Sequence, residues 1–194
     1  MQYSVVCVKS SEGGNSVKIE VKVGSEKKIF TVSEGTYREI GCPLSDDIID
    51  TDTLIAIEKE NRKRKVLEKA FRILAFADNN RKNLYRKLIA AGFTKEESEY
   101  ALEVCLKKGI IDENRQLERL IEKMANTDLF GPYRILPKLA AKGYSASDIR
   151  RIMTSLSEAG QIDFKKSADA LFEKMRPESY EEKQKILYKY GYKK

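Results

Sequence analysis

The spacing of hydrophobic and polar positions changes about a third of the way along the chain. Before residue 60 the spacing has the two-residue period of a β-strand: in SVKIEVKV (16–23) every second position is apolar, Gly24 and Ser25 follow, and KKIFTV (27–32) continues the apolar positions. This alternation predicts a β-hairpin with one apolar face. Two strands alone are marginally stable, so we expect a helix to cover the hairpin. A short helix is predicted from Ser33 to about Gly41, and a second follows the acidic segment DDIID.

From about Arg64 the apolar positions follow helical spacing, and the sequence repeats itself. KLIAAGF (87–93) returns as KLAAKGY (138–144), and GIID (109–112) returns as GQID (160–163), both 51 residues later. EKM (122–124) recurs at 173–175 with the same offset, and ILYKYGY (186–192) imitates the Leu-x-x-x-Gly-aromatic ending. A long period filled with helical patterns predicts an array of helical repeats.

Each repeat is expected to contain three helices, because capping residues divide it at matching places. Gly92 and Gly143 are typical left-handed ends of the second helix. Thr94 with Glu97 forms a capping box for the third helix of the first repeat. One position breaks the pattern: Pro137 falls inside the second helix of repeat two, where proline costs about 3 kcal/mol. Either that helix kinks or its regular part begins later.

The predicted fold class is mainly α, with tandem three-helix, helix-turn-helix-like repeats in an elongated, curved array after a small N-terminal β-hairpin and helix. We expect four parts: an N-terminal extension (1–60), repeat one (61–111), repeat two (112–162) and an incomplete third repeat of about two helices (163–194). The leucines, isoleucines and methionines on the helix faces are interpreted as packing residues. The tyrosines of the last segment, Tyr188, Tyr190 and Tyr192, are expected to pack against the incomplete repeat rather than to stack on bases.

Composition narrows the function classes. The chain has 194 residues, 41% of them hydrophobic, but no apolar run long enough for a membrane span and no signal-peptide pattern in MQYSVVCVKSSEGG. We therefore expect a soluble, cytoplasmic protein without a membrane partner. We also expect a monomer. Histidine is absent and the three cysteines are far apart, which removes the commonest general base and the usual zinc and nucleophile pairs. We expect no enzyme, no catalytic residues, no metal and no cofactor. Metal-dependent chemistry on carboxylates alone stays as the enzymatic alternative.

Charge divides unevenly along the chain. Of 37 Lys and Arg and 30 Asp and Glu, residues 1–64 hold 10 and 11, which leaves 27 and 19 for the remainder. The net charge is therefore −1 before residue 65 and +8 after it. A basic helical half favours an anionic partner such as nucleic acid, although a solvated helical surface explains the charge equally well.

Several segments together resemble the RecX family, the regulators of the RecA recombinase. TVSEGTYREIGCPLSDDIIDTDTL, after the hairpin, resembles the N-terminal extension of the Gram-positive, clostridial type. KAFRILAFADNNRKNLYRKLIAAGFTKEESEYALEVCLKKGIIDE resembles the first three-helix repeat. FGPYRILPKLAAKGYSASDI resembles the second-repeat signature, although Pro137 replaces a polar helix former.

The resemblance implies a non-enzymatic regulator that lies in the groove of the RecA–DNA nucleoprotein filament. It would modulate, mostly by inhibition, ATP hydrolysis, strand exchange and co-protease activity, and so act in DNA repair and the SOS response. Basic side chains of the repeats would meet acidic recombinase surfaces or single- or double-stranded DNA. The candidates are Arg81, Lys82, Arg86 and Lys87 in repeat one, Arg134, Lys138 and Lys142 in repeat two, and, second in rank, Arg150 and Arg151.

An independent DNA-binding protein of the helix-turn-helix type is the alternative. SASDIRRIMTSLSE (145–158) has the length of a recognition helix, and its exposed face would offer Arg150, Arg151, Ser155 and Glu158. This is a thin set of side chains for reading bases.

Overall fold

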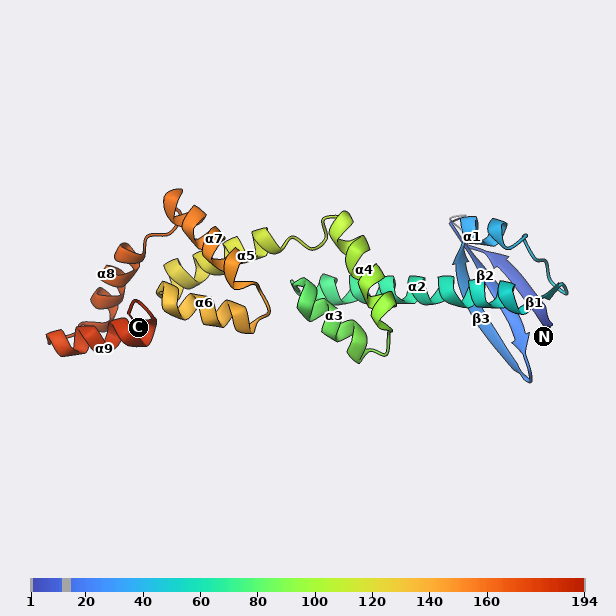
Figure 1. The fold of residues 1–194 in the computed structure, drawn as a ribbon, viewed down its shortest axis with the longest axis horizontal. Helices are drawn as coiled ribbons and strands as arrows, with labels where there is room; N and C mark the ends of the chain where they lie inside the picture. Colours follow the sequence, from blue (N-terminus) through green and yellow to red (C-terminus); the bar gives the residue numbers. More distant parts are fainter. Residues whose placement is uncertain (1, 12–14, 194) are drawn as a thin grey trace. The chain divides into compact units, whose positions relative to one another are not determined.

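The computed structural model describes residues 2–11 and 15–193, shown in Figure 1. The chain divides into two compact units. Unit 1 comprises Met1–Ala75 and Leu88–Val104, and unit 2 comprises Phe76–Lys87 and Cys105–Lys194. Helix α3 (Arg81–Ala90) and helix α4 (Lys95–Lys107) each contribute to both units.

Unit 1 begins with a four-stranded antiparallel sheet rather than a hairpin. Strands β1 (Tyr3–Ser10), β2 (Ser16–Val23), β3 (Glu26–Ser33) and β4 (Ile48–Ile49) lie in the order β3-β2-β1-β4. The predicted hairpin is β2–β3, and β1 and β4 were missed. A bulge between Val5 and Cys7 interrupts the two-residue period of β1, so the sequence VVCV shows no alternation.

One face of the sheet packs against two helices. Helix α1 (Glu34–Glu39) begins as predicted at Ser33, whose Oγ accepts a hydrogen bond from the Thr36 amide at 3.1 Å. Helix α2 (Thr51–Phe76) completes the cover. Their shared core is formed by Val5, Val17, Ile19, Val21, Phe30, Val32, Ile49, Leu54 and Ile57. The covering helix expected over the hairpin is therefore present.

Helix α2 is a single helix of 26 residues. It runs through residues 60 and 61, where the sequence suggested the end of the N-terminal extension, so the four-part division of the chain stays a prediction. Within unit 1, Arg62 on α2 binds the Glu97 carboxylate through two nitrogens, at 2.7 and 2.8 Å. Thr94 and Glu97 form the expected capping box: the Thr94 amide donates to Glu97 at 2.9 Å and the Glu97 amide to Thr94 at 3.2 Å.

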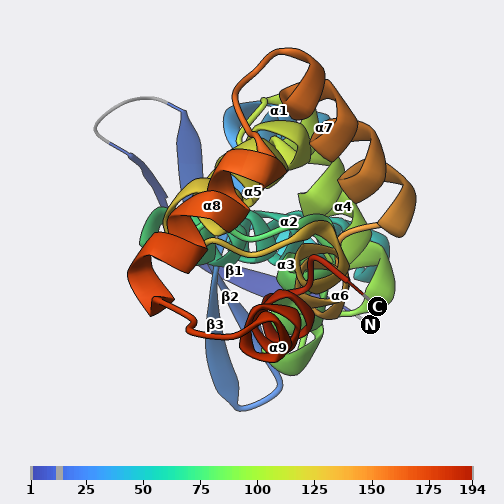
Figure 2. The ribbon, with the colours of Figure 1, turned by 90° about the vertical axis from the view of Figure 1, so that its left-hand side faces the viewer.

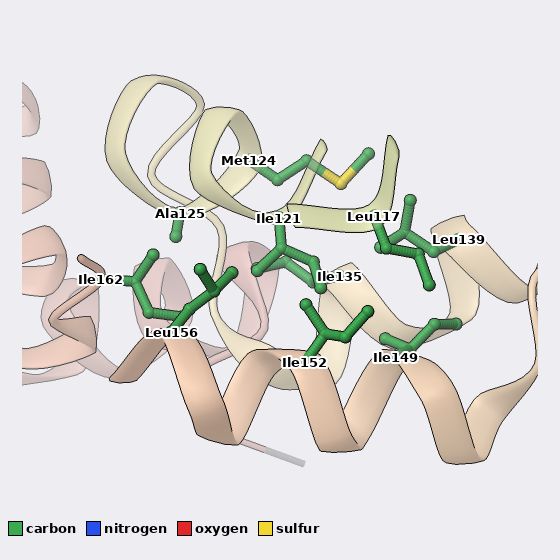
Figure 3. Close-up of a cluster of buried hydrophobic side chains, with 10 residues drawn as sticks. All are labelled: Leu117, Ile121, Met124, Ala125, Ile135, Leu139, Ile149, Ile152, Leu156 and Ile162. Carbon is green, nitrogen blue, oxygen red and sulfur yellow. The ribbon is translucent and has the colours of Figure 1, made fainter. Parts of the chain in front are cut away.

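Unit 2 contains the helices of the second repeat and two further helices. These are α5 (Glu113–Glu122), α6 (Pro132–Ala141), α7 (Ala146–Glu158), α8 (Phe164–Met175) and α9 (Tyr180–Tyr190). A π-helical turn, Lys123–Thr127, extends α5 and was not predicted. Figure 3 shows the core, in which side chains of α5, α6 and α7 point toward one another. The described part of the chain is thus mainly helical, with a small N-terminal antiparallel sheet.

Proline 137 lies inside α6, which runs from Pro132 to Ala141 as one helix. The helix has Gly131 as N-cap and Pro132 at its first position. It ends before Gly143, whose φ of 100° is left-handed. Among the described residues, no helix is both long enough and apolar enough to cross a bilayer.

Candidate functional site

The first turn of α6 is capped by the end of α9 instead of by a side chain. Gly131 offers no side-chain cap. Its amide donates to the Tyr190 carbonyl at 2.8 Å, and the Tyr133 amide donates to the Gly191 carbonyl at 3.0 Å. The amides at a helix start and the carbonyls at a helix end carry opposite partial charges. The two helix ends, which lie side by side in Figure 2, therefore satisfy each other.

Two glycines make this contact possible. A Cβ on Gly131 would overlap the Gly191 carbonyl and lie 2.6 Å from the Tyr192 amide nitrogen. A Cβ on Gly191 would lie 2.5 Å from the Arg134 amide nitrogen, and Gly191 also has a left-handed φ of 82°. Because the obstructing atoms are backbone, neither site can accept a side chain without moving a helix.

Arg134 joins the same two helix ends through its side chain. The guanidinium carbon lies 4.3 Å from the centre of the Phe130 ring and 5.5 Å from that of Tyr190. Nη1 also donates to the Lys189 carbonyl near the end of α9. A cation that lies over two aromatic rings and against helix C-terminal carbonyls is favourable on both counts. Arg134, a predicted contact residue, therefore stabilises the junction between α6 and α9.

A groove of about 700 Å³ runs beside this junction. Four cationic side chains line it, Arg134 and Lys138 from α6 with Lys189 and Lys193 from the end of α9 and beyond. The other lining residues are Tyr133, Pro137, Ala141, Tyr188 and Gly191, so no carboxylate is present among the described residues of this groove. We call it the α6–α9 groove. Its charge suits an anionic surface.

Two lysines are held at the edge of the groove by uncharged groups. The Lys138 ammonium lies 5.3 Å from the centre of the Phe130 ring, and the Lys193 ammonium donates to Gln184 Oε1 at 2.7 Å. The sequence interpretation missed Lys189 and Lys193, although both lie in the lysine-rich ending KYGYKK. It was also wrong about Tyr188, which is 69% exposed. Tyr190 and Tyr192 do pack: Tyr190 lies against Phe130, and the Tyr192 hydroxyl donates to the Leu129 carbonyl at 3.1 Å.

Another predicted basic residue, Lys142, belongs to a second polar contact in unit 2. The Lys142 carbonyl at the end of α6 accepts hydrogen bonds from the side-chain amides of Asn80 and Asn83, at 2.8 and 3.1 Å. Beside it lies a pocket of about 440 Å³ lined by Asp78, Asn80, Asn83, Gln116, Arg119, Leu120, Lys123, Lys142 and Tyr144. This pocket contains both charge signs and many paired groups. These features indicate that the pocket belongs to a structural contact and is not a binding surface for an anion.

The remaining candidates are mostly engaged within unit 2. Arg81 pairs with Glu113 at 3.6 Å, and the Lys82 side chain lies against Gly143. Arg86 donates to Asn83 at 2.6 Å, and Lys87 donates to Asn79 at 2.7 Å. On α7 both Arg150 and Arg151 are exposed, and Arg151 donates to Asn114 at 2.9 Å and to Asp148 at 3.3 Å. Of the predicted set, only Arg134 and Lys138 line a groove whose charged lining residues are all cations.

No acid–base group stands out near either contact. Burial raises the pKa of Tyr144, helped by the charges of Glu113 and Asp78, while its hydroxyl donates to Gln116 at 2.9 Å. Burial also raises the pKa of Tyr192. Both tyrosines are therefore neutral hydrogen-bond donors at physiological pH. Among the residues that the structure describes, no group of three or more Cys, Asp or Glu is arranged to hold a metal ion.

Comparisons with known proteins agree on one family. No protein-family model matches the sequence. A protein named regulatory protein RecX from Pseudomonas fluorescens is 33% identical over 98 residues, half of this chain. The crystal structure of a regulatory protein RecX superposes on 95% of the chain with a TM-score of 0.68 and 20% identity. The chain is therefore similar to RecX proteins over half of its sequence, and it has the fold of a RecX protein.

Other RecX proteins extend the comparison. A RecX of Stenotrophomonas maltophilia is 29% identical over 98 residues, and the crystal structure of RecX from Lactobacillus salivarius covers 67% of the chain with a TM-score of 0.56. The matched region spans 57% and 60% of the length of the Pseudomonas and Stenotrophomonas relatives. Within the RecX-like segment FGPYRILPKLAAKGYSASDI, Gly131 and Arg134 have a structural role that the sequence did not reveal: they hold α9.

Proposed function

We propose that this protein belongs to the RecX family and regulates a RecA-type recombinase by binding the RecA–DNA filament, with the α6–α9 groove as one contact surface. The observation that carries the site is the set of four cations in a groove without a carboxylate among its described lining residues. The names of the relatives support a regulatory role, and none of them is named as an enzyme.

The groove suits this role on electrostatic grounds. Lys138, Lys189 and Lys193 reach it with flexible side chains that adjust to carboxylates or phosphates. Contacts of this kind weaken steeply with salt, because binding releases counterions and because salt ions screen exposed charges. We propose that the protein acts as a monomer in the cytoplasm and needs no chemistry of its own, since occupying the filament suffices to alter ATP hydrolysis, strand exchange and co-protease activity.

The function is tested by RecA's DNA-dependent ATP hydrolysis. Purified protein, added to RecA on single-stranded DNA, should inhibit hydrolysis at substoichiometric to stoichiometric ratios. Bovine serum albumin at the same concentrations serves as the control for nonspecific effects. An unchanged rate at every ratio would rule out this function.

An independent helix-turn-helix DNA-binding protein remains the second candidate, because Arg150 on α7 is exposed. Its neighbour Arg151 is bound to Asn114 and Asp148, which leaves fewer groups for base contacts. This candidate requires tight binding of one duplex sequence over random DNA at physiological salt. Equal binding to all sequences would eliminate it.

A further inference from the structure

The outer face of the N-terminal sheet carries a cluster of lysines that the charge count along the chain conceals. Side chains alternate between the faces of a strand, and Val17, Ile19 and Val21 of β2 point into the core. Lys18 and Lys22 therefore point outward. The strand register places Lys9 of β1 opposite Lys18, and Lys27 of β3 opposite Lys22. All four lysines are exposed.

The arrangement brings like charges together in directly opposed pairs. Such pairs destabilise a sheet, and this face offers little to offset them. Glu20, between Lys18 and Lys22 on β2, is the only acidic residue among the described outward positions of β1, β2 and β3. Its carboxylate lies 3.5 Å from the Lys27 ammonium. The face therefore keeps a net charge of +3, from four lysines and one glutamate.

This charge does not follow from the composition of the region. Residues 1–64 have a net charge of −1, with 10 Lys and Arg against 11 Asp and Glu. Four of the acidic residues lie outside the sheet face in one short stretch, at Asp46, Asp47, Asp50 and Asp52. The fold thus separates the charges and collects cations on one flat face, and such a concentrated positive field attracts anions.

The spacing of the two lysine pairs suits a duplex. Lys18 and Lys22 are four residues apart on one strand, which corresponds to about 13 Å at about 3.3 Å per residue. The two phosphate backbones that border the major groove of B-DNA are about 12 Å apart. One pair, Lys9 with Lys18, can therefore meet one backbone while Lys22 with Lys27 meets the other.

We infer that the outer face of this sheet binds the phosphate backbones of duplex DNA, without reading its sequence. The contact is separate from the α6–α9 groove and does not depend on RecA. It gives the protein a way to hold DNA beside the filament that it regulates. Since lysines and phosphates carry the contact, its affinity falls steeply with salt.

The test is binding of the full-length protein to a short random-sequence duplex without RecA, measured by fluorescence anisotropy over a range of salt concentrations. The double variant Lys18→Gln with Lys22→Gln removes two outward lysines of β2. It should bind about tenfold more weakly near physiological salt, and the slope of log affinity against log salt should fall by about 2, one for each lost phosphate contact.

A matched control separates this face from general charge. Lys28→Gln with Lys59→Gln removes the same charge from unit 1, but Lys28 pairs with inward-facing Val21 and Lys59 lies on α2. The control should bind like the wild type, and thermal unfolding should show that both variants are folded. Equal losses in the two variants, or unchanged binding by the β2 variant, would overturn the inference.

The same wild-type and variant proteins distinguish duplex DNA from two other partners, single-stranded DNA and a lipid surface. Tighter binding to a single strand of equal length would contradict the duplex geometry. Binding to vesicles of phosphatidylserine and phosphatidylcholine that depends on Lys18 and Lys22, without such dependence for duplex DNA, would also overturn the inference and indicate a lipid surface. Because RecA is absent, failure here leaves the ATP hydrolysis test of the proposed function unaffected.

Discussion

Helices α3 and α6 are the same element of two successive repeats, and they begin in different ways. Both have ten residues, bury two aliphatic side chains one turn apart and lead to a left-handed glycine: Leu84, Leu88 and Gly92 in one, Ile135, Leu139 and Gly143 in the other. At the start of α3, Asn80 Oδ1 accepts from the Asn83 amide at 2.9 Å, as a side-chain cap does. At the start of α6, carbonyls of α9 take that role.

The difference shows where the repeats specialise. Shared positions keep the helix and its buried face, while the unshared start decides what each helix contacts. The start of α3 is completed by side chains: Asn80 caps it, and the Glu113 carboxylate of α5 accepts from the Arg81 amide at 2.8 Å. The uncapped start of α6 has to be completed by α9, and that docking brings Lys189 and Lys193 beside Lys138.

The largest expected change in stability comes from substitutions at one equivalent position inside the two helices. Arg86 occupies in α3 the position that Pro137 occupies in α6, 51 residues later. Arg86→Pro should lower the free energy of unfolding by about 3 kcal/mol, because proline removes an amide donor and clashes with the preceding turn. Pro137→Ala should raise it for the converse reason. Urea denaturation measures both, and stabilisation by Arg86→Pro would contradict the comparison.

The stability of the protein should be nearly as sensitive to a substitution at Gly131, where α6 meets α9. Gly131→Ala should cost about 2–3 kcal/mol, because the new methyl group meets the backbone of Gly191 and Tyr192. Gly92→Ala is the matched change after α3: its Cβ would meet no atom within 4 Å, so only the left-handed φ of 87° opposes it, at about 1 kcal/mol. Equal costs would mean that the close approach of α6 and α9 is unimportant.

Arg134 and Asn83 occupy equivalent positions in the two repeats but make contacts of different strength. Arg134→Ala should cost about 2 kcal/mol, because the stacking on Phe130 and Tyr190 and the bond to Lys189 are lost together. Asn83→Ala loses exposed hydrogen bonds to Lys142 and Arg86 and should cost about 0.5–1 kcal/mol. Thermal denaturation of the two variants ranks them. Arg134→Lys should restore only part of the loss, since lysine lacks the planar guanidinium.

The helices that follow, α4 and α7, each have a carboxylate whose contribution to stability depends on pH, and these contributions differ by a smaller amount. Glu97 of α4 and Asp148 of α7 are equivalent positions, and both have a lowered pKa: hydrogen bonding to Arg62 lowers that of Glu97, and hydrogen bonding to Ser145 lowers that of Asp148. Because the folded pKa lies below the unfolded one, each carboxylate stabilises the protein above its ordinary pKa. That stability is lost as pH falls through the folded value.

Glu97→Gln should therefore destabilise the protein at pH 7, and the difference from wild type should shrink below about pH 4.5, the ordinary pKa of the group. Asp148→Asn should behave alike below about pH 3.8, with a smaller effect. The reason is exposure: the Glu97 side chain is 16% exposed and that of Asp148 is 48% exposed. Chemical denaturation between pH 2.5 and 7 measures both. A pH-independent loss in Glu97→Gln would contradict the assigned cause.

The repeated helices and their ends could be predicted from the sequence because local residues determine them. Gly92, Gly143 and the Thr94–Glu97 box act within a few positions of themselves, so their patterns are readable. Strand β1 was missed because the bulge between Val5 and Cys7 removes its period. The π-helical turn Lys123–Thr127 left no distinctive pattern either.

The candidate site was predictable only in part, because it depends on contacts between residues far apart in the sequence. Arg134 and Lys138 were identified as basic positions, but Lys189 and Lys193 join them through a contact between segments more than 50 residues apart. Sequence spacing does not encode that contact, and neither did it show that Arg134 stacks on Phe130. The outward lysines of the sheet were concealed for a similar reason, since their pairing depends on strand register.

Co-sedimentation of the protein with RecA assembled on single-stranded DNA measures whether the α6–α9 groove contacts the recombinase filament. The variant Lys138→Glu with Lys189→Glu reverses two groove lysines and leaves Arg134 and the glycines in place. Its control, Lys165→Glu with Lys174→Glu, makes the same charge change on exposed positions of α8. We expect the groove variant to lose most of its filament binding and the control to bind like wild type. Equal binding by the two folded variants would contradict this expectation.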